Sequence, residues 1–228
     1  MTLIPKNITI GIDEAGRGPL AGPVMAAAVW LDAQRIPTDL LARIDDSKKL
    51  SAKNRTDIAA QLWRLCREPN PPIRAALGAA TVAEIDRLNI LQATFLAMIR
   101  AVTRLRVMPI TPENEADLNS AYFYADHVTL LIDGTQIPPV WRQADCPFYA
   151  QAIIGGDGLC KEIAAASILA KTARDLAMQK LDRIYPEFGF ARHAGYGTTF
   201  HRAAIAEFGL TPHHRPLFCR GSLFLERV

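Results

Sequence analysis

The first half of the chain shows the apolar periodicity of strands that are followed by helices. Residues 8–12 alternate and are rich in β-branched side chains, which predicts a strand of about five residues. Residues 24–31 form an uninterrupted apolar run, as expected for a strand that is buried on both faces. Because Gly22 and Pro23 lie in the short connection between these segments, we expect the chain to begin with a β-turn-β unit.

Two helices are predicted next, and each starts after a residue that suits a helix N-terminus. Ser51 can cap a helix that ends near Leu65, before prolines that cannot continue it. Thr81 and Glu84 have the spacing of a capping box. The apolar stripe that follows predicts that this second helix continues as far as Leu105.

The remaining elements mix strands with helices. Residues 73–80 are predicted as a strand, and two further strands end at Asp133 and near Ile154. Residues 161–185 form an alanine-rich segment that predicts a long helix, closed by the proline that follows. A shorter helix is expected from Thr198 or Thr199 to Gly209. Strands interleaved with helices imply an α/β core.

Composition narrows the class of protein without identifying it. Half of the 228 residues are apolar, but no uncharged stretch reaches the roughly 18 apolar residues that span a membrane. The N-terminus has no signal-peptide core, so we expect a cytoplasmic protein without a membrane partner. Cysteines at positions 66, 146, 160 and 219 lack the spacing of a zinc site and are predicted to be free thiols. A net charge of +3 does not by itself indicate a nucleic-acid-binding protein.

Two adjacent acids, Asp13 and Glu14, follow the first predicted strand and precede a glycine-flanked arginine at residues 16–18. Neighbouring strand residues point to opposite faces, so both acids can share a metal only where the strand ends or bulges. We expect the glycines to supply that break. Divalent cations take oxygen ligands from carboxylates and phosphate, which indicates a metal and phosphate site. A single acidic pair is more often a solvated turn.

The same arrangement recurs twice, which favours the metal site over the turn. An apolar strand leads into Asp133 and Gly134, and another leads through Gly156 into Asp157. One acid at a strand end is usually a turn former or a helix cap. Three such ends predict carboxylates that converge at one end of a sheet.

These acids belong to a series of short motifs that spans residues 8–218. The motifs are Asp13-Glu14-Ala15-Gly16-Arg17-Gly18, Asp46-Ser47-Lys48-Lys49-Leu50-Ser51, Asn89-Ile90-Leu91 with Ala97-Met98, Asp133-Gly134, Gly156-Asp157, residues 164–171 with Arg174-Asp175, Gly195-Tyr196-Gly197-Thr198, and His214-Arg215 with Phe218. In content and order the series resembles ribonuclease HII, the type 2 family of ribonucleases H. An ordered set is far more specific than any one of its motifs.

The resemblance implies a fold and an activity. The fold is α/β, a ribonuclease H-like mixed β-sheet flanked by helices. Residues 1–186 would form the catalytic core, and residues 187–228 a small C-terminal helical extension packed on it. The implied enzyme is a monomeric, metal-dependent endoribonuclease. It would hydrolyse the RNA strand of RNA/DNA hybrids and incise duplex DNA at embedded ribonucleotides, leaving a 3′-hydroxyl and a 5′-phosphate.

The resemblance assigns catalysis and metal binding to Asp13, Glu14, Asp133 and Asp157. Two divalent ions, Mg²⁺ or Mn²⁺, suit phosphodiester hydrolysis because together they activate a water, stabilise the pentacovalent phosphorus and neutralise the leaving oxyanion. The sequence leaves open which carboxylate bridges the two ions. A substrate phosphate would complete the ligands of the second ion.

Substrate recognition is expected at two glycine-rich loops and one lysine-rich loop. Gly16 and Gly18 let backbone amides approach a sugar-phosphate, and Arg17 adds a charged fork. The resemblance assigns these residues to ribonucleotide recognition and places Tyr196 against the sugar that bears the 2′-hydroxyl. Lys48 and Lys49, with Lys53 and Arg55, are candidate phosphate contacts. The alternatives are an exposed loop tyrosine, a solvated lysine face and, for His214-Arg215, a structural role.

The chain departs from the family at several points. Many members have lysine where Gly155 and Ala194 stand, and a basic residue at Leu159. These changes remove positive charge near the expected nucleic-acid path, so they affect affinity and substrate range while the carboxylates remain. Residues 221–226 faintly resemble a sliding-clamp peptide, but they lack its glutamine, which favours a packed or frayed terminus.

Two other classes of function, a nucleotide-binding enzyme and a noncatalytic binding protein, fit the sequence less well. Gly16, Gly18 and Gly22 superficially match a dinucleotide-binding loop, but that loop must open a helix, whereas an apolar strand follows here. A Walker-type site fails because no Gly-Lys-Ser/Thr follows. A noncatalytic hybrid-binding or clamp-associated protein would be expected to lack one of the carboxylates, and none is missing.

Overall fold

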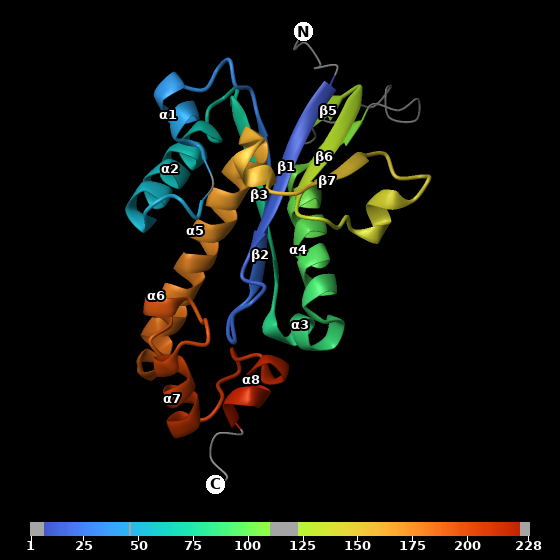
Figure 1. The fold of residues 1–228 in the computed structure, drawn as a ribbon. Coiled ribbons are helices and arrows are strands. Elements are labelled where there is room, and N and C mark those ends of the chain that lie inside the picture. The colour runs from blue at the N-terminus through green and yellow to red at the C-terminus, as the bar shows by residue number, and fades with distance from the viewer. Residues whose placement is uncertain (1–6, 46, 110–122, 224–228) are drawn as a thin grey trace.

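The structure is a computed structural model, and it describes residues 7–45, 47–109 and 123–223. A five-stranded mixed sheet lies at its centre (Figure 1). In spatial order its strands are β3 (Ile73–Ala80), β2 (Val24–Leu31), β1 (Asn7–Ala15), β6 (His127–Asp133) and β7 (Tyr149–Ile153). The prediction of a mixed sheet flanked by helices is confirmed.

The directions of these strands determine where the acids gather. β1 pairs with β2, and β2 with β3, in antiparallel fashion. β1, β6 and β7 run parallel, with Ile12 opposite Ile132 and Asp133 opposite Ile153. Because the carboxyl ends of parallel strands meet at one edge of a sheet, Asp13 and Asp133 lie at the same end.

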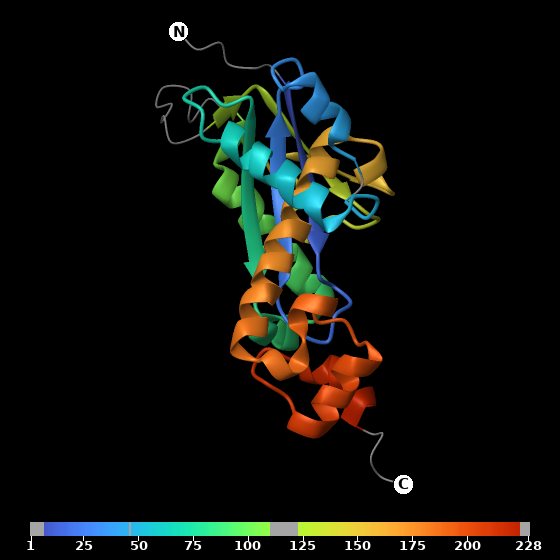
Figure 2. The same cartoon turned by 90° about the vertical axis from the view of Figure 1, so that its left-hand side faces the viewer.

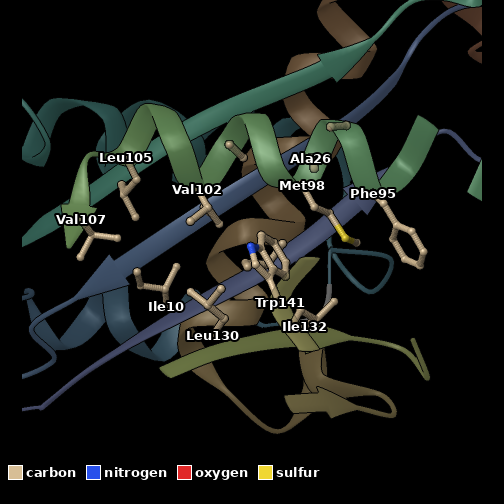
Figure 3. Close-up of a cluster of buried hydrophobic side chains, with 14 of the residues drawn as sticks. Ile10, Ala26, Phe95, Met98, Val102, Leu105, Val107, Leu130, Ile132 and Trp141 are labelled. Atoms are coloured by element: carbon tan, nitrogen blue, oxygen red, sulfur yellow. The ribbon is translucent and has the colours of Figure 1, made fainter. Parts of the chain in front are cut away.

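One helix covers each face of the sheet. α4 (Ile90–Leu105) packs on β2 and β3, and α5 (Lys161–Ile184) packs on the opposite face against β1 and β2, with α2 (Ala52–Leu65) beside it (Figures 1 and 2). Alternation along β1 places Ile8, Ile10 and Ile12 in the core beneath α4, part of which Figure 3 shows. The residues of β1 that alternate with these isoleucines, among them Gly11 and Asp13, therefore face α5.

Gly11 allows α5 to pack unusually close to β1. A Cβ atom at this position would overlap the carbonyl carbon of Glu162 and the amide nitrogen of Ile163, in the first turn of α5. A residue without a side chain is therefore needed where the helix backbone meets the middle of the strand.

Several local predictions are confirmed at residue level. β2 and β3 have the expected bounds, Ser51 caps α2, and Thr81 and Glu84 make the capping box of α3 (Val82–Leu88). The prediction of one continuous helix up to Leu105 is wrong, because Asn89 has a φ of 69° and separates α3 from α4. Its side chain accepts a hydrogen bond from the Gln92 amide, so Asn89 begins a new helix.

The shorter elements connect these layers. α1 (Thr38–Arg43) precedes α2, and β4 (Val107–Pro109) pairs with β5 (Phe123–Ala125) in a separate two-stranded sheet. Single turns of 3₁₀ helix lie before and after β7, η1 (Pro139–Arg142) and η2 (Gly156–Gly158).

The C-terminal part extends from the end of α5 (Figures 1 and 2). It comprises η3 (Pro186–Phe188), α6 (Phe190–His193), α7 (Thr199–Phe208) and α8 (Pro216–Leu223). Thr198 caps α7 and Gly209 follows it, as predicted. The apolar cluster of this part includes Leu20 and Ala21 from the connection between β1 and β2, which ties the C-terminal helices to that loop.

The four cysteines are free thiols, as predicted. Among the helices that the structure describes, none has both the length and the apolar character needed to cross a bilayer.

Candidate active site

β1 is longer than predicted, and this changes how its two acids are presented. Strand pairing with β2 continues through Asp13, Glu14 and Ala15, and the first glycine with left-handed backbone is Gly16, with a φ of 98°. The expectation that glycines would interrupt the strand at the acids is therefore wrong. The hairpin partner keeps the strand extended after pairing with β6 has ended, so the two carboxylates leave on opposite faces.

Three carboxylates converge on the α5 side of the sheet end. Oxygens of Asp13, Asp133 and Asp157 all lie within 4.8 Å of one another. Asp13 and Asp157 are buried, and Asp133 is the last residue of β6. Asp13 also accepts a hydrogen bond from Ser167 on α5. The structure thus brings together three of the four acids that were predicted as ligands.

Asp157 reaches this group from a turn, and not from a strand end as predicted. β7 ends at Ile153, and Asp157 lies in η2. The turn is held against β6 because the Gly156 amide donates to Asp133 Oδ1 at 2.8 Å. Lys48 Nζ lies 3.2 Å from Asp157 Oδ2, so the lysine-rich loop also reaches the carboxylates.

Burial and mutual repulsion make the ionised form of these acids unfavourable. Burial, followed by the negative charge of Glu14, raises the pKa of Asp13 well above its usual value. Burial also raises the pKa of Glu14, against the opposing charge of Arg17, and that of Asp133, to which Asp157 adds repulsion. A divalent cation would compensate the negative charge of these neighbouring carboxylates, and it prefers oxygen ligands of this kind.

Glu14 lies outside the group of three and faces a cleft beneath α4. The cleft is lined by Glu14, Arg17 and Asp133 together with Leu91 and Met98. Arg17 Nη1 lies 3.5 Å from Glu14 Oε1. Asp133 and Glu14 both border this cleft and the neighbouring cleft, which Asp13 lines as well.

Two buried arginines organise the loop at residues 16–23. The guanidinium of Arg215 donates to the carbonyl oxygens of Gly16, Arg17, Pro19 and Gly22, at 2.7–3.0 Å. These contacts support a structural role for Arg215, which was one of the two interpretations of its motif. Burial lowers its pKa to about 10, so it stays charged at neutral pH.

Arg174 is the second of these arginines and comes from α5. It donates to the carbonyl oxygens of Ala21 and Pro23, and to that of Ala194 in the loop that carries Tyr196. Its side chain fills the space that a Cβ at Gly16 would occupy. One side chain therefore fixes the distance between the two glycine-rich loops.

Tyr196 lies across from the first glycine-rich loop. Its side chain is half exposed and borders the same cleft as Asp13, Gly16 and Lys48. A Cβ at Gly18 would lie 3.8 Å from Tyr196 Cε1. The two glycine-rich loops thus lie beside one cleft.

The other predicted cations are placed differently from one another. Lys49 is exposed and pairs with Asp45 at 3.5 Å. Arg55 instead supports the lysine-rich loop, donating to the carbonyl oxygens of Ser47 and Leu50 and to Asp175. Asp46, the first residue of this motif, and residues 224–226 of the tail lie outside the described residues.

Sequence reasoning did not single out the side chains that support the site. Ser47 and Ser167 share a buried hydrogen bond of 2.8 Å next to Asp13, and Arg174 joins the two glycine-rich loops. A serine and an arginine within an alanine-rich helix are the signal that could have found them, since an apolar face has no other use for either.

The sequence of this chain is similar to those of known proteins. The family model of ribonuclease HII matches residues 10–221. A ribonuclease HII of Rhodospirillum rubrum is 50% identical over 209 residues, which cover 91% of this chain and 82% of the relative.

Two solved structures share the fold. The ribonuclease HII of the PCNA:RNase HII complex from Archaeoglobus fulgidus has a TM-score of 0.65 and 22% identity, over 91% of this chain and 93% of that one. Bst-RNase HIII, solved in complex with Mn²⁺, has a TM-score of 0.61 and 17% identity, over 94% of this chain and 65% of that one. At such identities the likeness supports the fold alone.

Proposed function

Because the chain belongs to the ribonuclease HII family, we propose that it is a metal-dependent endoribonuclease that cuts the RNA strand of RNA/DNA hybrids and incises duplex DNA at embedded ribonucleotides. Membership of the family supports endoribonuclease activity on RNA/DNA. The observation that supports metal-dependent cleavage is that carboxylate oxygens of Asp13, Asp133 and Asp157 lie within 4.8 Å of one another.

The carboxylates would hold the cations on the two sides of Asp133. Asp13, Asp133 and Asp157 would hold one ion, and Glu14 with Asp133 would hold the other, which makes Asp133 the candidate bridge. When bound, two Mg²⁺ or Mn²⁺ ions supply an activated water and stabilise the phosphorus centre and the leaving oxyanion. The Mn²⁺ complex of Bst-RNase HIII supports manganese as one such ion. Hydrolysis of this kind leaves a 3′-hydroxyl and a 5′-phosphate.

The residues around the cleft would select the cleavage position. Gly16 and Gly18 are proposed to present backbone to the sugar-phosphate, with Arg17 on a phosphate and Tyr196 against the ribose. Lys48 lies beside Asp157, where it would meet the scissile region, while Lys49 is proposed as a more distant phosphate contact. The 2′-hydroxyl is the group that distinguishes RNA from DNA at this position.

Assembly and location are proposed more simply. We infer a monomeric cytoplasmic enzyme with a core at residues 1–186 and an extension at residues 187–228 that shares an apolar cluster with the core. The Archaeoglobus fulgidus complex with PCNA supports a sliding clamp as a candidate partner. The tail residues that would reach such a clamp lie outside the described residues.

One incision assay tests the proposal. An end-labelled duplex DNA with a single ribonucleotide is incubated with the protein in Mg²⁺, in Mn²⁺ or in chelator, beside an RNA/DNA hybrid and an all-DNA duplex. We expect cleavage of the first two substrates in either metal, none in chelator, and product ends that a ligase can use. Cleavage of the all-DNA duplex, or full activity in chelator, would contradict the proposal.

A further inference from the structure

A buried pair of imidazoles lies directly behind the loop that carries Tyr196. The side chains of His201 and His214 are almost fully buried, and their Nε2 atoms lie 3.0 Å apart. His201 Nδ1 lies 2.9 Å from the Tyr196 carbonyl oxygen. Neither histidine borders the carboxylates, so catalysis as proposed above leaves this pair without a role.

The hydrogen-bond partners allow only one placement of the ring hydrogens. The Thr211 amide donates to His214 Nδ1 at 2.9 Å, so this nitrogen has a lone pair and a neutral His214 carries its hydrogen on Nε2. His201 Nε2 must then accept, which leaves the hydrogen of His201 on Nδ1. That hydrogen points to the Tyr196 carbonyl. The result is a directed chain from Thr211 through both rings to Tyr196.

A third histidine holds the other side of the same loop. His193 Nε2 donates to the Phe188 carbonyl at 2.8 Å, so His193 Nδ1 is free to accept from the Gly195 amide at 3.2 Å. The rings of His193 and His201 are stacked, with centroids 4.5 Å apart and planes at 20°. Imidazoles therefore hold the peptide unit between residues 194 and 195 and the one between residues 196 and 197.

The surroundings keep the pair neutral. Rings of Phe188 and Phe190 pack against both imidazoles, and the charged or titratable neighbours are His193, His213 and Arg202. A second hydrogen on His201 would lie on Nε2 and oppose the Nε2 hydrogen of His214, and a second hydrogen on His214 would lie on Nδ1 and oppose the Thr211 amide. The chain of hydrogen bonds therefore exists only with neutral rings.

We propose that His201 and His214 are positioning residues that set the Tyr196 backbone, and through it the ring that reads the ribose. This inference rests on the proposed function and adds residues to its recognition step. The side chain of Tyr196 is half exposed, and its carbonyl accepts from His201 and from the Thr198 amide. These two hydrogen bonds hold the backbone from which the ring projects.

Two substitutions at one position separate positioning from packing. His201→Phe keeps an aromatic ring in the core but cannot donate to Tyr196, while His201→Asn keeps a donor near the position of Nδ1 but loses ring contacts. We expect the phenylalanine variant to lose about tenfold in kcat/KM on a single-ribonucleotide duplex and some thermal stability, because His214 Nε2–H is left buried without an acceptor. The asparagine variant should keep more of its kcat/KM and lose more thermal stability, because it also loses the ring contacts with Phe188 and Phe190. His127→Phe, at an exposed histidine at the start of β6, is the matched control.

A double-mutant cycle with Tyr196→Ala gives the decisive measurement. If His201 acts through Tyr196, His201→Phe should reduce kcat/KM less than about twofold further once Tyr196 is alanine. Equal factors in both backgrounds would overturn the inference, while incision by the wild type would leave the proposed function standing. Should His201→Phe lose the near-ultraviolet circular dichroism of the wild type, His214→Phe takes its place in the same cycle. A wild type that cuts neither substrate would count against the proposed function itself.

Discussion

Asp13 and Arg215 are both buried and ionisable, and both lie beside the loop at residues 16–18, yet their surroundings are opposite. The neighbours of Asp13 include two other acids, and its pKa is raised well above the usual value by burial first and by Glu14 second. The guanidinium of Arg215 is surrounded by backbone carbonyl oxygens, which accept hydrogen bonds from each of its three nitrogens.

The difference separates the part of the site that needs a ligand from the part that is complete in the protein. An acid surrounded by acids lowers the stability of the folded chain until a cation binds. A cation surrounded by carbonyl oxygens stabilises the loop that it touches whether or not substrate is present. Substitutions among the acids should therefore reduce activity more than stability, whereas substitutions of the arginine should reduce stability more than activity.

The largest effect is expected from Asp133→Asn. This change removes the charge of the candidate bridging ligand and keeps its size, so cleavage should fall below about 1% of wild type while hybrid binding persists. Single-turnover cleavage in Mg²⁺ and a binding titration in chelator check both parts. Turnover above a few per cent would remove Asp133 from the metal centre and weaken the contrast with the arginines.

Arg215→Met should mainly affect stability. It leaves carbonyl oxygens of the glycine-rich loop buried without a donor, so we expect a loss of about 3 kcal/mol or more in the free energy of unfolding. Chemical denaturation measures this loss. Arg64→Met, on the exposed face of α2, is the matched control and should change stability by less than about 0.5 kcal/mol. Equal losses at both positions would show that the carbonyl contacts have no special weight.

Tyr196→Ala should affect selectivity between substrates. Incision at a lone ribonucleotide should fall about tenfold more than cleavage of a long hybrid, because only the lone site requires one sugar to be told from DNA. Parallel kcat/KM measurements on the two substrates provide the comparison. The same fractional loss on both would mean that Tyr196 only supports its loop.

Asp13→Asn should raise the stability of the metal-free protein. The pKa of Asp13 is raised on folding, so its cost is absent below the usual pKa of an aspartate and complete above the raised one. In chelator at neutral pH we expect the variant to melt about 2–4 °C higher, the shift that about 1 kcal/mol produces in a domain of this size. The difference should shrink as the pH falls toward the usual pKa and reverse in Mg²⁺. A variant that melts lower at neutral pH without metal would refute the account of repulsion.

The smallest effect concerns the missing lysine at residue 194. Ala194 already has a left-handed backbone, with a φ of 48°, so lysine adds no new backbone strain there. If this position faces nucleic acid, Ala194→Lys should tighten hybrid binding and steepen the dependence of log affinity on log salt by up to about 0.9. A salt titration with a folded variant tests this, and an unchanged slope would show that residue 194 does not face the substrate. Gly155, with a φ of 65°, is the less suitable position because lysine is disfavoured there.

Most of the fold could be predicted because its signals are local. The bounds of β2 and β3 follow from apolar runs, and the starts of α2 and α3 follow from Ser51 and Thr81, which act within one turn. The length of β1 could not be predicted, since pairing with β2 extends it. The break at Asn89 was missed because asparagine tolerates left-handed backbone without requiring it.

In the candidate site, too, the residues that local patterns indicate could be predicted, and those that depend on distant contacts could not. Asp13 and Asp133 could be predicted because acids at the ends of parallel strands meet wherever the sheet forms. The contacts of Arg215 join residues up to 199 positions apart, so no local pattern indicates them. Glu14 and Arg17 line a cleft, and the side of the sheet on which Glu14 lies depends on the pairing of β1 with β2.

The close approach at Gly11 also sets how residues of β1 align with residues of α5. Gly11 lies against Ile163, and Asp13 meets Ser167, so two strand residues correspond to four helical residues. Two residues of a strand advance about 6.6 Å and four of a helix about 6 Å, so the two elements stay nearly in phase over this distance. A methyl group at residue 11 would shift that phase. The misalignment would reach the carboxylates through the backbone of α5, although every residue of the site remained unchanged.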